Sequence, residues 1–380
     1  MDIYNLPTPS LILDQAKLRR NIERMAKAAN AHGVALRPHM KTAKSMDVAR
    51  LVLADQPGGI AVSTLKEAEY FATNGIRDIQ YAVGIVPDKL GRVAAIQKSG
   101  ARIILVTDSV DVARAVTAEG RDLSARFSVQ VEIDCGEGRA GVYPESNELL
   151  EIARTIDEST NAVFAGVMIH AGHSYRCRSI AEVEEVAEAE RAAVVSAAER
   201  LRAADIECPI VSVGSTPTAL YARSLEGVTE VRPGVYMFGD VFQAQINSCD
   251  ISDLAVSVIT EVNSHRPALK RLLIDAGALA LSKDRSTENT PNDIGFGMVA
   301  DIDGRPFMPQ LRVSRVYQEH GQVELPSERA LRDQPIGSRL RIYPNHVCMT
   351  VAMYEDYHVV DSEQGNGREV VAKWSRINGW

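Results

Sequence analysis

The feature that most constrains the fold is an alternation of short β-branched runs with longer amphipathic stretches from about residue 10 to 240. Helical patterns separate the runs, for example over 65–75, 147–159 and 180–205, and several of them end in glycine. Eight strands alternating with helices predict a parallel α/β fold, and this number favours a closed (β/α)8 barrel of the TIM type. The predicted strands are 34–39, 59–64, 78–83, 102–108, 127–134, 164–172, 210–216 and 229–238.

The pattern changes after about residue 245, where long helical periodicity gives way to alternating runs such as LAVSVITEV, QLRVSRVYQE and REVVAKWS. Alternation with a period of two predicts a smaller, mainly antiparallel β domain. We therefore expect a barrel domain over residues 10–243 and a β domain over residues 244–380 together with 1–9. A chain of 380 residues is long enough for two domains with separate cores.

Composition and charge exclude several classes of partner. The chain has 42 basic and 50 acidic residues, and its net charge of −8 disfavours non-specific binding to nucleic acid or to an anionic membrane. No apolar run reaches the roughly 18 residues of a membrane helix, and the start MDIYNLPTPS does not resemble a secretory signal. Five scattered cysteines without CxxC spacing favour a reducing cytoplasm over a disulfide framework.

Residues that can take part in ligand binding or catalysis follow the ends of the predicted strands. Because the carboxyl ends of barrel strands meet at one mouth, where barrel enzymes place their active sites, we expect these residues to lie together. A lysine at such a mouth can bond covalently to a carbonyl compound. The residues are Lys41, Arg139, His170, His173, Gly214, Ser215, Thr216, Arg232 and Gly234.

Gly214-Ser215-Thr216 has two interpretations. Glycine permits close backbone approach and the hydroxyl groups can donate, so the segment fits a phosphate cup at the start of a helix. The same residues fit an ordinary N-cap equally well. Gly136–Gly141 formally matches GxGxxG, but Val142-Tyr143-Pro144 separates these glycines from the next helix, which argues against dinucleotide binding.

His346-Val347-Cys348 lies in an alternating run of the second domain, RLRIYPNHVCMTVAMY. On a strand, residues i and i+2 share a face, so the imidazole and the thiolate could bind one metal ion. Nitrogen and sulfur ligands favour zinc. Two ligands leave positions for water or substrate, as in a catalytic site. The alternative is a buried histidine beside a core cysteine.

Together these residues resemble the fold-type III pyridoxal-phosphate (PLP) enzymes, which are built like alanine racemase. Within them, the chain is similar to the group of D-serine dehydratases and D-threonine aldolases. The resemblance spans nearly the whole chain and rests on landmark segments that occur in the family's order. These are LPTPSLILD, RPHMKTAK, QVEIDCGEGRAGVYP, HAGHSY, EVRPGVYMFGD, LIDAGALALSKD, QEHG and PNHVCMT.

The resemblance implies two cofactors, PLP and a divalent metal ion. Lys41 would hold PLP covalently, and Arg232 would face its pyridine nitrogen. The metal would be zinc first, with manganese, cobalt, nickel or magnesium as alternatives. The phosphate would lie among Gly214, Ser215, Thr216, Gly234 and Tyr236, the cofactor or substrate would touch Arg139, His170 and Tyr175, and the metal ligands would be His346 and Cys348.

The resemblance also implies a function: a dehydratase, a carbon–oxygen lyase, that converts a D-3-hydroxy amino acid into a 2-oxo acid and ammonia. D-serine, D-threonine and D-threo-3-hydroxyaspartate all remain open as substrates. His173-Ser174 replaces the group's usual Asn-Thr, so His173 and Arg176 are candidates to bind a second carboxylate. The family further implies a homodimer with its active site at the interface, and the cysteine pattern places it in the cytoplasm.

The closest alternative is an aldolase that releases glycine and an aldehyde. Aldolase relatives tend to have His-x-Asp where this chain has His346-Val347-Cys348, which favours the dehydratase. A racemase would leave the metal pair unexplained. A non-catalytic PLP-binding protein would match the barrel alone, and here about 130 further residues carry the proposed metal ligands.

Overall fold

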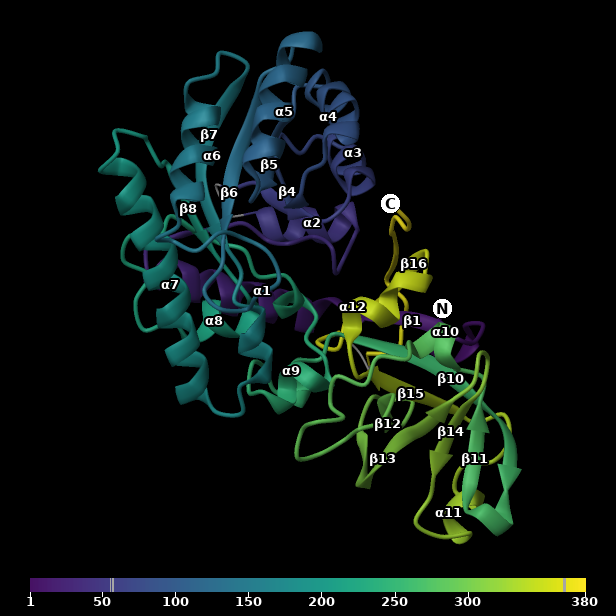
Figure 1. Ribbon diagram of the computed structural model, residues 1–380. Helices are drawn as coiled ribbons and strands as arrows, with labels where there is room; N and C mark the ends of the chain where they lie inside the picture. The colour runs from purple at the N-terminus through teal and green to yellow at the C-terminus, as the bar shows by residue number, and fades with distance from the viewer. Residues whose placement is uncertain (55, 57, 365–366) are drawn as a thin grey trace. The chain divides into compact units, whose positions relative to one another are not determined.

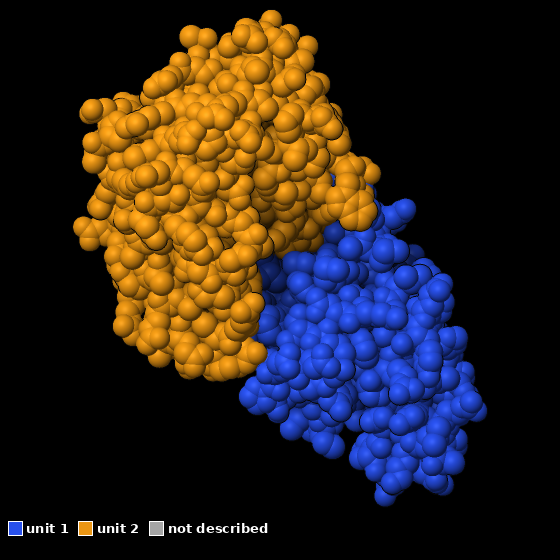
Figure 2. Space-filling view, viewed as in Figure 1, with its two compact units in different colours: residues 1–23, 235–378 blue, residues 24–234, 379–380 orange. Residues whose placement is uncertain are grey.

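The computed structural model describes residues 1–380 apart from 55, 57, 365 and 366. The chain divides into two compact units, which Figure 2 shows in different colours. Residues 24–234 and 379–380 form one unit, here called the parallel unit, and residues 1–23 and 235–378 form the other, the antiparallel unit. Helix α1 (Gln15–Ala31) contains the boundary between them.

The parallel unit is built on one curled eight-stranded sheet in the order β2-β9-β8-β7-β6-β5-β4-β3. Each neighbouring pair is parallel, and each predicted run overlaps one of these strands. A further parallel bridge joins His39, just after β2, to Ala61 of β3. The strands are β2 Ala35–Leu36, β3 Ile60–Val62, β4 Asp78–Gly84, β5 Arg102–Thr107, β6 Phe127–Ile133, β7 Ala162–Ile169, β8 Ile210–Val213 and β9 Glu230–Val231.

Several helices of this unit begin at hydroxyl side chains in the segments between strand and helix. Thr64, Ser109 and Ser179 each accept a hydrogen bond from a backbone N–H in the first turn of the next helix, the usual N-cap contact. The helical patterns over 65–75, 147–159 and 180–205 are confirmed. The helices are α2 Met46–Leu53, α3 Leu65–Thr73, α4 Leu90–Gln97, α5 Val110–Asp122, α6 Asn147–Asp157, α7 Ile180–Arg202 and α8 Thr216–Tyr221.

The antiparallel unit contains a nine-stranded sheet in the order β11-β14-β13-β12-β15-β10-β1-β16-β17. Since β10 also pairs with β11, six of these strands close into an antiparallel barrel (Figure 1). Its described helices are short: α9 Val241–Gln245, α10 Ala278–Leu281, α11 Arg329–Arg332 and α12 Val347–Thr350. The strands are β1 Ser10–Asp14, β10 Val256–Arg266, β11 Arg271–Ile274, β12 Gly297–Ala300, β13 Pro306–Val316, β14 Gly321–Glu324, β15 Arg339–Pro344, β16 Asp356–Val360 and β17 Ala372–Ser375.

The structure corrects two expectations about strands. Ser10–Asp14, expected with the barrel, pairs with β10 and β16 of the antiparallel unit. All five of its residues are buried, so the sequence carries no period that assigns it to one sheet. In the predicted strand 229–238 only Glu230–Val231 is extended. Pro233 has no N–H to continue the ladder, and Val235–Met237 form a 3-10 turn.

His346-Val347-Cys348 was expected on a strand, and this expectation is wrong. Strand β15 ends at Pro344, and His346 is the N-cap of α12. Two buried side chains divert the backbone. Asn345 donates to the Gly295 carbonyl at 2.6 Å, and the Asp240 carboxylate accepts the Val347 N–H at 3.0 Å. Backbone groups that would pair with a neighbouring strand are thereby bonded to side chains instead.

A membrane span is also excluded among the described helices, since none of them combines the required length with sufficient hydropathy.

Candidate active site

Lys41 lies where the chain leaves the first strand of the parallel sheet. The backbone of this segment is fixed to β3, because the Met40 N–H donates to the Ala61 carbonyl and the Ala61 N–H donates to the Pro38 carbonyl. The Lys41 side chain is exposed, whereas His39 is buried. The turn therefore presents the amine at the surface from a rigid base.

Buried nitrogen groups lie near Lys41. Burial, followed by the charges of Lys41 and Arg232, holds the pKa of His39 well below its usual value. Burial also lowers the pKa of His170 to about 3, although the Gly214 carbonyl accepts from its Nδ1 at 2.5 Å. Both imidazoles are therefore neutral at pH 7, and the positive charge of the cluster lies on Lys41 and Arg232. This arrangement suits an anionic ligand.

Arg232 is buried at the centre of this cluster. Its guanidinium donates to the Ser212 hydroxyl at 2.5 Å and to the Ile169 carbonyl at 2.6 Å. Ser212 in turn donates to Glu230, which forms a buried ion pair with Arg37. The side chain is thus held in one orientation, and these two bonds use two of its five N–H donors.

The loop after β8 confirms the N-cap, one of the two interpretations that the sequence left open. Ser215 caps α8: its hydroxyl accepts the Thr218 N–H at 3.2 Å, and its own N–H donates to the Thr218 hydroxyl at 3.2 Å. Gly214 has φ +153°, and a Cβ there would lie 2.6 Å from the backbone nitrogen of Arg232. A Cβ on Gly234 would lie 2.8 Å from the His39 carbonyl oxygen. Both glycines are therefore required by close packing against neighbouring backbone, and the phosphate cup stays a prediction.

Arg139, Tyr175 and Tyr236 are the other residues predicted to contact the cofactor. Arg139 is half-exposed and forms long ion pairs with Glu132 (3.4 Å) and Glu137 (3.9 Å). Tyr175 lies in the 3-10 turn Gly172–Arg176 after β7. Tyr236 is buried in the antiparallel unit, and burial raises its pKa. Arg139 and Tyr175, by contrast, belong to the same unit as Lys41.

His346 and Cys348 are brought together in the antiparallel unit. Their side chains interact directly, and His346 donates from Nδ1 to Asp284 Oδ2 at 2.6 Å. Because Nδ1 is used, Nε2 is the imidazole atom available to a metal ion. A carboxylate that orients a histidine in this way is typical of metal sites.

The charges around His346 favour a cation. Burial lowers the pKa of His346, but Asp284, Cys348 and Asp240 outweigh burial and raise it to about 11. The His346 hydrogen bond in turn lowers the pKa of Asp284. Groups that stabilise a proton on this imidazole also stabilise a divalent cation, and the thiolate–imidazole pair suits zinc. The donor set therefore fits a metal ion.

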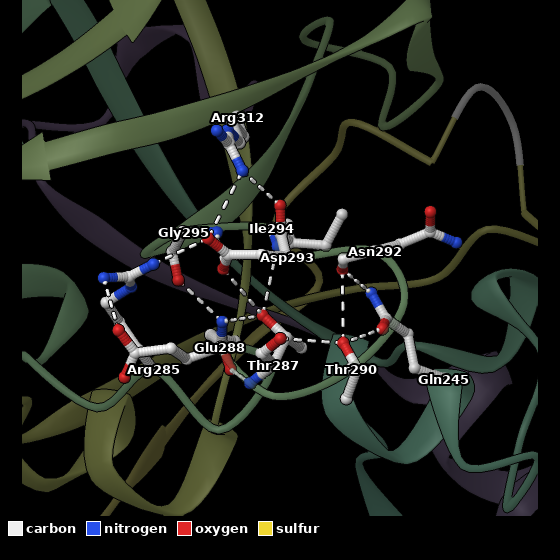
Figure 3. A network of polar contacts seen from close by, with 11 residues as sticks. Gln245, Arg285, Thr287, Glu288, Thr290, Asn292, Asp293, Ile294, Gly295 and Arg312 are labelled. Carbon is white, nitrogen blue, oxygen red and sulfur yellow. Dashed lines mark hydrogen bonds and ion pairs between the residues drawn. The ribbon is translucent and has the colours of Figure 1, made fainter. Parts of the chain in front are cut away.

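A network of polar contacts holds the loop that carries Asp284 (Figure 3). Asp293 accepts from Arg285 at 2.6 Å and from the Gly295 N–H at 2.8 Å. The side-chain amide of Asn345, directly before His346, makes two bonds to Thr287. Its Nδ2 donates to the Thr287 hydroxyl at 2.7 Å, and its Oδ1 accepts the Thr287 backbone N–H at 3.2 Å. The segments that contribute Asp284 and His346 are therefore joined through Asn345.

Sequence reasoning missed Asp284 and Asp240 as functional residues. Both lie in landmark segments, LIDAGALALSKD and EVRPGVYMFGD, but carboxylates of this kind are common at strand ends and loops. Among the residues that the structure describes, no three His, Cys, Asp or Glu side chains are grouped to hold a metal ion. The assignment of His346 and Cys348 as metal ligands therefore stays a prediction.

Comparison with known proteins identifies the family. The model of the alanine racemase N-terminal domain matches residues 13–241, and that of a putative serine dehydratase domain matches residues 255–360. The chain is 42% identical to D-threo-3-hydroxyaspartate dehydratase from Delftia sp. (strain HT23), covering 100% of this chain and 99% of that protein. It is 31% identical to D-serine dehydratase from Dictyostelium discoideum, covering 95% of each.

Comparison with solved structures leads to the same family. The D-threo-3-hydroxyaspartate dehydratase structure from Delftia sp. HT23 has a TM-score of 0.95 at 41% identity and covers 100% of both chains. D-threonine aldolase from Filomicrobium marinum has a TM-score of 0.82 at 26% identity, covering 98% of this chain and 95% of that one. Alanine racemase from Clostridium difficile 630, at 15% identity and a TM-score of 0.72, shares the fold. The chain therefore belongs to the fold-type III PLP family, in the group that joins an alanine racemase N-terminal domain to a D-serine dehydratase domain.

Proposed function

We propose that this protein is a PLP- and metal-dependent dehydratase of D-3-hydroxy amino acids. The observation that carries the proposal is the pairing of His346 with Cys348, oriented by Asp284, in a chain that also presents Lys41 among buried cationic and imidazole groups. The relative at 42% identity is named D-threo-3-hydroxyaspartate dehydratase. Solved variants of that enzyme replace a histidine and a cysteine two positions apart, and the cysteine variant is described as metal-free.

We assign the two cofactors to different parts of the chain. The parallel unit holds PLP through Lys41, with Arg232 at its pyridine nitrogen and its phosphate beside the Gly214–Thr216 loop. Zinc is the preferred metal, held by His346 Nε2 and Cys348 Sγ, with manganese, cobalt, nickel or magnesium as alternatives. The bridge between His39 and Ala61 supports closure of the parallel sheet into a (β/α)8 barrel.

The chemistry divides between the cofactors and the chain. When bound, PLP supplies a ring that stabilises negative charge at the substrate Cα, and the metal supplies a Lewis acid for the β-hydroxyl group. Lys41 Nζ would hold the cofactor, and its free amine would serve as the base for the substrate Cα proton. Arg232 would face the pyridine nitrogen with its guanidinium cation and disfavour protonation of that nitrogen, which would disfavour freely reversible carbanion chemistry. The hydroxyl leaves as water, and one water is consumed when the released enamine hydrolyses to a 2-oxo acid and ammonia.

We propose D-threo-3-hydroxyaspartate as the preferred substrate, ahead of D-serine and D-threonine. This substrate has a second carboxylate, which calls for a further donor. Of the described residues, none forms a hydrogen bond with the buried Nδ1 of His173, and Arg176 lies exposed in the same turn. These two side chains are our candidates for that carboxylate.

The alternative function is that of an aldolase. The chain is 30% identical to 3-hydroxy-D-aspartate aldolase from Paracoccus denitrificans, over 94% of this chain and 89% of that protein. Cys348 favours the dehydratase, because aldolase relatives tend to have aspartate there. A product assay separates the two: purified protein given D-threo-3-hydroxyaspartate should release equal amounts of 2-oxo acid and ammonia. Glycine and an aldehyde would identify the aldolase.

We also propose a cytoplasmic homodimer with its active site at the interface. Leu279, Met349 and Met353 are exposed on α10, α12 and the following 3-10 turn, beside the His346 segment. Exposed apolar side chains grouped in this way are typical of interfaces. No disulfide joins the cysteines, which supports a reducing compartment. Analytical ultracentrifugation should give twice the mass of the chain, and a monomer would contradict this part of the proposal.

A further inference from the structure

Glu190 is a buried carboxylate that the proposed mechanism does not use. It lies in the middle of α7 and is 1% exposed. A carboxylate without solvent needs hydrogen-bond donors to offset the loss of hydration. The identity of those donors indicates what the residue does.

The donors come from the two loops that follow β7 and β8. Glu190 Oε1 accepts the Ala171 N–H at 2.9 Å and the Gly214 N–H at 3.1 Å. A side-chain hydrogen bond to Thr218 adds the first turn of α8. One carboxylate on α7 therefore connects the loop after β7 with the segment that forms the loop after β8 and the first turn of α8.

These segments carry the groups assigned to the cofactor. His170 directly precedes Ala171, and its Nδ1 donates to the Gly214 carbonyl at 2.5 Å. Ser215 follows Gly214, and its hydroxyl lies 2.9 Å from that of Ser174 in the loop after β7. Since Gly214 is bonded on both sides, through its N–H to Glu190 and through its carbonyl to His170, the orientation of its peptide groups depends on Glu190.

We propose that Glu190 is a positioning residue that holds the loops after β7 and β8 in the geometry that receives the PLP phosphate. The inference rests on the proposed function, because it takes PLP as the ligand of these loops. Glu190 acts through Gly214 and Ala171, so its own contact with the cofactor is not required. Its removal should affect recognition of the phosphate more than recognition of the pyridine ring.

The test compares two ligands on cofactor-free protein: PLP, and pyridoxal, which lacks the phosphate. Glu190→Leu leaves two buried N–H groups without an acceptor, so we expect its dissociation constant for PLP to rise about tenfold or more, with a much smaller change for pyridoxal. Glu190→Gln should bind both ligands like the wild type, because the amide oxygen can accept both N–H groups. Glu188→Gln, an exposed position on the same helix, is the matched control.

Two results would overturn the inference: Glu190→Leu binds PLP like the wild type, or it loses PLP and pyridoxal to the same extent. If Glu190→Leu does not fold, Glu190→Ala is measured in the same way, and equal losses for the two ligands again count against the role. Failure of the proposed function gives a different result, since wild-type protein and Glu188→Gln would then bind no PLP at all.

Discussion

Asp284 determines which imidazole nitrogen of His346 is available to a metal ion. Its carboxylate accepts the Nδ1 proton at 2.6 Å, which fixes the ring orientation and leaves Nε2 for the proposed metal ion. Ser286 donates to the other carboxylate oxygen at 2.7 Å. Asp284 therefore has one defined position relative to the imidazole.

Replacing Asp284 should weaken metal binding without disturbing PLP. We expect Asp284→Ala to lower zinc affinity by about 10–100-fold, the usual effect of losing such a partner. Asp284→Asn should lie between this variant and the wild type, because an amide oxygen still accepts the Nδ1 proton. Zinc titration against a chelating dye gives the affinities. Glu288→Gln, an exposed ion-pair residue in the same loop, serves as control, and unchanged affinity in Asp284→Ala would contradict the assignment.

The neutral imidazoles near Lys41 predict a pH dependence. The pKa of His170 is about 3 in the folded chain, against an ordinary value of 6.5, so unfolding takes up a proton between these values. Stability should therefore fall as the pH drops through this range. His170→Gln should reduce the slope of the unfolding free energy against pH by up to about 1.4 kcal/mol per pH unit. Urea unfolding of the cofactor-free protein measures it, and an unchanged slope would show that His170 is protonated in the fold.

Residue types at strand ends were enough to predict most of the cluster around Lys41. Lys41, His170, Arg232 and Gly214 follow strands of one parallel sheet, and such positions meet at one edge. Asp284 and Glu190 were not predictable in this way. Their roles depend on which backbone or imidazole N–H groups the fold brings to them, and no local pattern contains this information.

Among the elements, the parallel sheet is tied together by a buried ion pair. Arg37, after β2, donates to Glu230 of β9 at 2.9 Å and to Asp78 of β4 at 3.0 Å. Glu230 also accepts from Ser212, the residue that holds Arg232. The pair therefore connects these strands, through Ser212, to Arg232.

Glu230→Ala should destabilise the parallel unit strongly, because it leaves most of the buried Arg37 charge unpaired. We expect a loss of about 3 kcal/mol in the free energy of unfolding. Glu69→Ala, which removes an exposed ion pair with Arg92, should cost less than about 1 kcal/mol. Chemical denaturation of both variants gives the two losses in the free energy of unfolding. Similar losses would show that the buried ion pair stabilises the fold no more than the exposed one.

Hydrophobic periodicity predicted the parallel elements well because strand and helix patterns differ in period and alternate regularly. It failed for Ser10–Asp14, a fully buried strand whose sequence does not say which sheet it joins. It failed again at His346–Cys348, where side chains of Asn345 and Asp240 take the backbone hydrogen bonds of a strand. At both segments the local structure depends on contacts with residues distant in the sequence.

For the molecule as a whole, the proposed cofactors depend on different units. Lys41 and Arg232 belong to the parallel unit, and His346, Cys348 and Asp284 belong to the antiparallel unit. Family matches to both parts of one chain support a single enzyme that uses both.

Metal removal should therefore abolish dehydration and leave PLP bound. Chelation followed by dialysis is expected to give protein that retains its cofactor absorbance but releases no 2-oxo acid, and zinc should restore activity. Cys348→Ala should behave like the chelated protein even when zinc is added. Full activity after metal content has fallen to zero would contradict the Lewis-acid role.

The central claim is that Lys41 carries the cofactor. Borohydride reduction of the purified protein, followed by peptide mapping, tests it most directly. The account predicts one pyridoxyl adduct on the peptide that contains Lys41, retained in Lys44→Ala, whose side chain is instead ion-paired with Glu67 at 3.3 Å. An adduct on another lysine, or none at all, would contradict the account.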